Sequence, residues 1–159
     1  MLLPQASAWG APKKTMVKPF TKVLVGTDFS ESAAHAVEMA VDVAVRYKAK
    51  LVVVHAWDVP TLGYGGMMQA PVDFITPLEQ AAHQQLEELA KELRKNHPDL
   101  EALLYQGVAW DRVLAAVDET KADLVVVGTH GRTGIRRALL GSVAECVVRL
   151  SPVPVLTVH

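Results

Sequence analysis

The stretch LVVVGTHGRTGIRRALLGSVAECVVRL, residues 124–150, decides the fold of this chain and indicates where a ligand would bind. It opens with an apolar, mostly β-branched run at 124–127, which is typical of a strand buried on both faces of a parallel sheet. Glycines follow at 128, 131 and 134, and a second apolar segment begins after Gly141 and Ser142. This order predicts a strand, then a loop at the carboxyl edge of a sheet, then a helix.

The glycine-rich loop has the composition of a phosphate-binding nest. Glycine permits positive φ and a close approach of the backbone, so that successive N–H groups can converge on one anion. Arg132, Arg136 and Arg137 lie between Gly128 and Gly141 with no acidic residue among them. The loop is therefore locally positive, although the formal net charge of the whole chain is −1.

Ser142 has two interpretations. With Glu145 it matches a capping box, in which the serine is the N-cap of the helix and the glutamate stands at the third helical position. In the other interpretation, the serine hydroxyl and the first N–H groups of the helix face phosphate oxygens. The combined spacing of Gly128, Gly131, Gly141 and Ser142 is far more specific than a lone Gly-x-Gly and favours a phosphate site.

Strand and helix patterns alternate along the rest of the chain. Apolar runs predict strands at 23–25, 51–54, 102–105, 124–127 and 153–156. Amphipathic patterns predict helices after the N-cap Ser30 and at 78–96, 110–119 and 142–150. This alternation implies a parallel sheet covered on both faces through right-handed crossovers. The predicted fold class is α/β, with a doubly wound five-stranded sheet.

Length and composition indicate one soluble globular domain. The chain has 159 residues, of which 50% are hydrophobic and 21% charged. A pI of 6.6 argues against a general binder of nucleic acids or anionic membranes. No apolar run approaches the roughly 20 residues that a membrane-spanning helix needs. We expect a domain at 18–159 preceded by a loose arm at 1–17 that is no convincing signal peptide, and a cytoplasmic location, because the single Cys146 cannot form an internal disulfide.

These motifs resemble those of the universal stress protein family, and specifically its ATP-binding branch. The nucleotide motif of that branch, G-x2-G-x9-G-[ST], is matched by Gly128, Gly131, Gly141 and Ser142. The resemblance covers about residues 18–159 and includes VGTDFS after the first strand and VVVH at the end of the second. It implies a Rossmann-like sheet of the adenine nucleotide alpha hydrolase-like type, with strand order 3-2-1-4-5. The strand order reverses between strands 1 and 4, which would bring Asp28 and Gly128 to one crevice.

The resemblance implies ATP as the ligand, accompanied by Mg²⁺ or Mn²⁺. The residues it assigns to the nucleotide are Gly26, Thr27, Asp28, Ala56, Val127, Gly128, Gly131, Arg132, Gly141, Ser142 and Val143. Asp28 would lie near the ribose, and the backbone of Ala56 would meet the adenine edge. A loop aspartate commonly does no more than bond nearby backbone N–H groups, and this remains the alternative for Asp28. His55 is interpreted as structural.

Other functional classes fit less well. The chain lacks Gly-x4-Gly-Lys-[ST], and its glycine motif follows the fourth strand and not the first, which disfavours a P-loop NTPase and a Rossmann dehydrogenase. A weak or partner-activated ATPase and a nucleotide-free protein-interaction module remain alternatives. Because the sequence offers no general base with an orienting partner, we expect a binding and regulatory protein with little ATPase activity.

Two further expectations concern partners. The resemblance implies a homodimer through the terminal strand Val153 to Val158, and a protein partner that the sequence does not identify. Residues 59–77 are rich in Gly, Pro and Met. They predict a long connection that either covers the nucleotide or is a disordered excursion.

Overall fold

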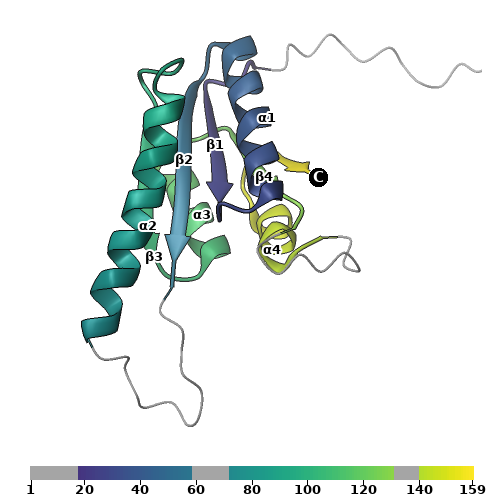
Figure 1. The fold of residues 1–159 in the computed structure, drawn as a ribbon. Helices are drawn as coiled ribbons and strands as arrows, with labels where there is room; N and C mark the ends of the chain where they lie inside the picture. Colours follow the sequence, from purple (N-terminus) through teal and green to yellow (C-terminus); the bar gives the residue numbers. More distant parts are fainter. Residues whose placement is uncertain (1–17, 59–71, 131–139) are drawn as a thin grey trace, which may run out of the picture.

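The computed structural model describes residues 18–58, 72–130 and 140–159. Within these ranges the chain forms a five-stranded sheet with all neighbouring strands parallel (Figure 1). In chain order the elements are β1 (Lys22–Thr27), α1 (Glu31–Tyr47), β2 (Lys50–Trp57), α2 (Val72–Leu93), β3 (Glu101–Gln106), α3 (Ala109–Thr120), β4 (Leu124–Gly128), α4 (Ser142–Leu150) and β5 (Val155–Val158). The strand order β3-β2-β1-β4-β5 confirms the predicted order and fold class.

Two apolar layers hold the helices on the sheet. Side chains alternate along β1, so that Val23 and Val25 pack with α1 and α2, whereas Leu24 packs with α3 and α4. Figure 1 shows α1 and α2 on the near face of the sheet and α3 behind it. Because both faces are covered, the strands read as continuous apolar runs and not as alternating ones.

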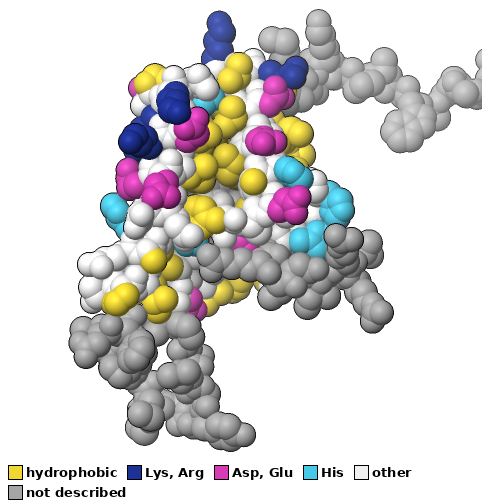
Figure 2. All heavy atoms as spheres, viewed as in Figure 1, with side chains coloured by type: hydrophobic (Ala, Val, Ile, Leu, Met, Phe, Trp, Pro, Cys, Tyr) yellow, Lys and Arg dark blue, Asp and Glu magenta, His cyan; other side chains and the backbone are white. Residues whose placement is uncertain are grey.

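Helix α1 follows its sequence pattern closely. Its N-cap is Ser30, whose side-chain oxygen accepts a hydrogen bond from the N–H of Ala33 at 3.3 Å. The buried residues of the helix recur at helical spacing on its inner face and are Ala33, Ala36, Val37, Ala40 and Ala44. Figure 2 shows charged side chains gathered on the outward sides of α1 and α2. Small side chains on the inner face let α1 lie close to the sheet.

Helix α2 begins earlier than its sequence pattern predicts. It starts at Val72 and contains Pro77, so the connection expected at 59–77 is wrong in its last part. The proline lies near the start of the helix, and Ala82, Leu86 and Ala90 further along are buried against the sheet. Residues 59–71 lie outside the described ranges, and the expectation that they cover the ligand stays a prediction.

A carboxylate fastens β1 to β4 at the amino edge of the sheet. Asp123, which precedes β4, accepts hydrogen bonds from the N–H groups of Thr21 and Lys22 at 2.8 and 3.0 Å. Both strands are therefore fixed at this edge, and their carboxyl ends lie side by side at the other. None of the helices in the described ranges has the length and apolar character needed to cross a bilayer.

Candidate functional site

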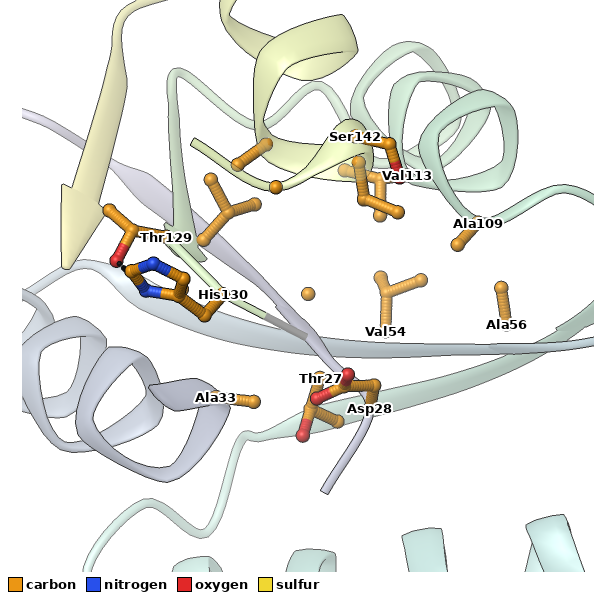
Figure 3. A pocket seen from close by; sticks show the side chains of 16 residues that line it. Thr27, Asp28, Ala33, Val54, Ala56, Ala109, Val113, Thr129, His130 and Ser142 are labelled. Atoms are coloured by element: carbon orange, nitrogen blue, oxygen red, sulfur yellow. Dashed lines mark hydrogen bonds between the residues drawn. The ribbon is translucent and has the colours of Figure 1, made fainter. Parts of the chain in front are cut away.

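A cavity lies at the carboxyl edge of the sheet, where β1, β2 and β4 end and where α3 and α4 begin (Figure 3). The predicted site residues that line it are Gly26, Thr27, Asp28, Ala56, Val127, Gly128, Gly141, Ser142 and Val143. Gly131 and Arg132, together with Arg136 and Arg137, lie outside the described residues. Segments distant in the sequence thus meet at the crevice between β1 and β4, as the strand order requires.

The turn between β1 and α1 is held by its own side chains. Thr27 Oγ1 accepts from the N–H of Phe29 at 3.1 Å, and Asp28 Oδ1 accepts from the N–H of Ser30 at 3.0 Å. Phe29 takes the left-handed conformation with φ of 62°. Asp28 therefore makes the local bonds of its structural interpretation and also lines the cavity.

The buried side chain of His55 contacts two residues of this turn. It is 5% exposed, its Nδ1 lies 2.8 Å from the carbonyl oxygen of Thr27, and its ring lies 4.5 Å from that of Phe29. These contacts agree with the structural role expected for His55.

Gly128 is required by packing and not by positive φ, which corrects the expectation for this glycine. Among the described glycines, only Gly107 has positive φ, at 130°. A Cβ on Gly128 would lie 2.6 Å from Ser32 Oγ and 2.8 Å from the Ser32 carbonyl oxygen. The end of β4 thus touches the first turn of α1, and Ser32 Oγ accepts from the N–H of His130 at 3.3 Å.

The predicted capping box at Ser142 is wrong. The N-cap of α4 is Gly141, with φ of −68° and ψ of 156°, and no side-chain cap is present among the residues that the structure describes. The carbonyl of Gly141 accepts from the N–H of Glu145 at 2.8 Å, which makes Ser142 the first helical residue. The first N–H groups of α4 therefore have no side-chain cap at the point where the helix borders the cavity.

Besides the first N–H groups of α4, the backbone carbonyl of Ala56 borders the cavity. In β2, Lys50 donates its N–H to Thr21 on the β1 side, whereas Trp57 accepts from Gly107 on the β3 side. Backbone groups alternate along a parallel strand, so the carbonyl of Ala56 is directed toward β1. Pairing with β1 ends one residue earlier, at Thr27 and His55. The N–H of Phe29, which would come next, goes to Thr27 Oγ1, so the Ala56 carbonyl faces the cavity beyond the end of β1.

Six further residues that the sequence did not predict as site residues line the cavity. Ala33, Val54, Ala109, Val113, Thr129 and His130 also border the cavity. Ala109 and Val113 come from the first two turns of α3, and a usable signal was present: a helix that follows a parallel strand begins at the carboxyl edge. One end of the cavity is consequently apolar, and the start of α4 provides backbone donors.

Comparison with known proteins agrees with this architecture. A family model described as the universal stress protein family matches residues 19–159. Universal stress protein MJ0531 of Methanocaldococcus jannaschii is 31% identical over 143 residues, covering 87% of this chain and 82% of that protein. Universal stress protein Rv1996 of Mycobacterium tuberculosis is 34% identical over 141 residues, but they cover only 44% of that longer protein and 87% of this chain. A universal stress protein crystallised in complex with cAMP is 32% identical with a TM-score of 0.62, covering 89% of this chain and 98% of that one.

Proposed function

The chain belongs to the universal stress protein family, and from that premise we propose that it binds ATP at the carboxyl edge of its sheet and acts as a nucleotide-dependent regulatory protein. The observation that carries the proposal is the start of α4. Its first N–H groups border the cavity without a side-chain cap, and the N-cap is a glycine. Such a terminus combines unpaired donors with the positive end of the helix dipole, which suits phosphate.

The rest of the cavity supplies partners for the other parts of the nucleotide. The Asp28 carboxylate follows the end of β1 and lies across the cavity from Ser142 in Figure 3, where a ribose hydroxyl would donate to it. The Ala56 carbonyl is an acceptor, which suits the exocyclic amine of adenine. Val54 and Val127 give the apolar surface that an aromatic base requires. The relative that was crystallised with cAMP supports an adenine nucleotide as the ligand class.

The cavity is too small to enclose a whole ATP molecule. Its volume is about 140 Å³, which is less than the roughly 300–1,000 Å³ of typical small-molecule sites. In this proposal, the base and sugar occupy the cavity and the phosphates extend along the start of α4. Gly131 and Arg132, outside the described ranges, keep their predicted phosphate role.

The proposed Mg²⁺ or Mn²⁺ would arrive with the nucleotide. In the described part of the chain, no group of three or more His, Cys, Asp or Glu side chains could hold a metal ion. Mg²⁺ commonly keeps several waters and binds substrate phosphates with only one or two carboxylates. Asp28 is the carboxylate that lines the cavity, and the donor set therefore fits a metal held mainly by the triphosphate.

Substitutions at Ser142 test the proposal. Ser142→Ala removes the hydroxyl alone, whereas Ser142→Pro also removes the first N–H of α4. Proline is favoured at the first helical position, and the extended conformation of Gly141 suits the residue before a proline. We expect ATP affinity, measured by isothermal titration calorimetry, to fall about 10-fold in Ser142→Ala and about 10-fold further in Ser142→Pro.

Circular dichroism should show that both variants are folded. Equal ATP affinity in all three proteins would contradict a phosphate site at the start of α4. The same samples separate binding from catalysis: we expect phosphate release slower than about 1 s⁻¹, near the low end of typical enzymes. Nucleotide released from freshly purified protein, identified by mass spectrometry, would show which ligand the cell supplies.

A further inference from the structure

We propose that helix α3 selects the base of the nucleotide, and that Ala109 is the residue that decides which rings enter. This inference rests on the proposed function and assigns a specificity role to residues outside the glycine motif. The relevant geometry is the end of the cavity farthest from Thr129 and His130 (Figure 3).

Apolar side chains face each other across this end. In Figure 3, Val54 and Ala56 extend from β2 toward the cavity, and Val113 and Ala109 extend from α3 on the opposite side. We call this end of the cavity, between the apolar side chains of the strand and those of the helix, the slot. A flat heteroaromatic ring is the ligand part that fills such a slot with contact on both faces.

Helix α3, which forms one side of the slot, packs tightly on the sheet. Val113 is 4% exposed, and its Cγ2 lies only 3.2 Å from the place a Cβ on Gly26 would occupy. Ala116 and Val117 are also buried, at 0% and 2% exposed, in the layer below α3. The helix has no room to move toward the sheet, and moving away would open this core.

The edge of the slot has a defined polarity. The Ala56 carbonyl faces the cavity past the end of β1, as the strand alternation requires. An amino group on the ring can donate to it, whereas a ring oxo group would place two acceptors together. The Ala56 carbonyl therefore favours a ring that turns an exocyclic amine toward it, as adenine can, over a ring that turns an oxo group toward it.

Ala109 controls entry for a steric reason. It is the first residue of α3, it is only half-buried, and it lines the cavity with a single methyl group. A longer side chain at 109 would extend into the slot, whereas the same change at the buried Val113 would disturb the core. The start of α4, which holds the phosphates in this proposal, belongs to a separate element and keeps its backbone donors.

The experiment compares ATP with inorganic tripolyphosphate, which carries the phosphates without a base. We expect Ala109→Leu to lower ATP affinity by about 10- to 100-fold, as overpacking of a filled apolar site does, and to leave tripolyphosphate affinity unchanged. Ala109→Ser, which adds one atom, should keep ATP affinity within about threefold. Ala81→Leu on α2, an exposed alanine away from the cavity, is the matched control and should match wild type for both ligands. Calorimetry gives the affinities, and circular dichroism shows that each variant is folded.

Different results of this experiment contradict different parts of the proposal. Full ATP affinity in folded Ala109→Leu overturns the role of α3. Loss of both ATP and tripolyphosphate in a folded variant overturns the division into a base end and a phosphate end. If Ala109→Leu does not fold, Ala109→Val takes its place with the same readings. Failure of wild type to bind either ligand contradicts the proposed function itself.

Discussion

The N–H of Gly141 donates a hydrogen bond to the carbonyl oxygen of Thr129 across 2.7 Å. This bond ties the start of α4 to the end of β4. The N–H of Thr129 in turn donates to Val158 in β5, also at 2.7 Å. Thr129 is 8% exposed, and its hydroxyl lies 3.0 Å from the Nδ1 atoms of both His130 and His159. One buried residue thus connects the candidate phosphate site to the last strand.

The substitution Thr129→Val tests the role of the hydroxyl group apart from that of the backbone hydrogen bonds. Valine keeps the shape and both backbone bonds but removes the group shared by His130 and His159. We expect the free energy of unfolding, measured by urea denaturation, to fall by about 1 kcal/mol. ATP affinity should stay within about twofold, because backbone bonds position Gly141. Thr76→Val, at an exposed position on α2, is the control and should change stability less. A large loss of ATP affinity would show instead that the hydroxyl positions the site.

Gly128→Ala and Gly26→Ala form a matched pair. A Cβ at 128 meets backbone atoms of Ser32 within 3 Å, whereas a Cβ at 26 meets the side chain of Val113 at 3.2 Å. A side chain can shift and a packed helix backbone cannot. We expect Gly128→Ala to lower the free energy of unfolding by about 1–3 kcal/mol. In Gly26→Ala the contact is offset by the roughly 0.5–1 kcal/mol that alanine gains over glycine inside a strand. Equal losses in urea denaturation would contradict this difference.

The sequence predicts best what depends on local periodicity and least what depends on distant contacts. The inner face of α1 follows from its repeat of small apolar residues. The phosphate role of Gly131 and Arg132, inferred from the glycine spacing, stays a prediction. The cap of α4 could not be predicted this way. Gly141 is the N-cap, and its N–H donates to the carbonyl of Thr129, 12 residues earlier in the chain. Ser142 then begins the helix, and the local capping pattern does not apply.

The orientation of the Ala56 carbonyl could not be predicted either, because it also depends on distant contacts. Its orientation depends on where β1 stops pairing and on Thr27 Oγ1 taking the N–H of Phe29. Neither is encoded by residues next to Ala56. Ala109 and Val113 show a periodic helical pattern, which correctly predicts a helix but does not show that its first turn borders a cavity.

The hydrogen bonds of Asp123 should make the stability of the folded protein fall in acid. Burial raises the pKa of this carboxyl, but hydrogen bonds from Lys22 and Thr21 outweigh it and hold the pKa below the ordinary 3.8. A lowered folded-state pKa stabilises the native state above the unfolded pKa. This contribution is lost as the pH falls below 3.8 through the lower, folded-state value. We expect urea midpoints of wild type to decline over this range, and those of Asp123→Asn to decline less from a lower value at neutral pH. Parallel pH profiles of the two proteins would contradict this role.

The terminal strand provides the last prediction, a homodimer through the outer edge of β5. The carbonyl of Pro154 accepts from Val125 in β4, and that of Val158 accepts from Thr129 just after β4. Alternation therefore directs the N–H groups of Val155 and Thr157 outward. No strand of the described ranges pairs with this outer edge, and such an edge is a template for a second copy across a twofold axis. Thr157→Pro removes one outward N–H without touching the ladder with β4, and proline is tolerated on that side of an edge strand.

Light scattering at micromolar concentrations should show a wild-type dimer and a Thr157→Pro monomer, because an antiparallel pair across the twofold loses a ladder bond in each copy. Thr157→Val keeps the N–H at the same exposed position and should remain dimeric. ATP binding by the monomeric variant shows that it is folded. A monomeric wild type, or a Thr157→Pro protein that stays dimeric, would mean that β5 is not the interface.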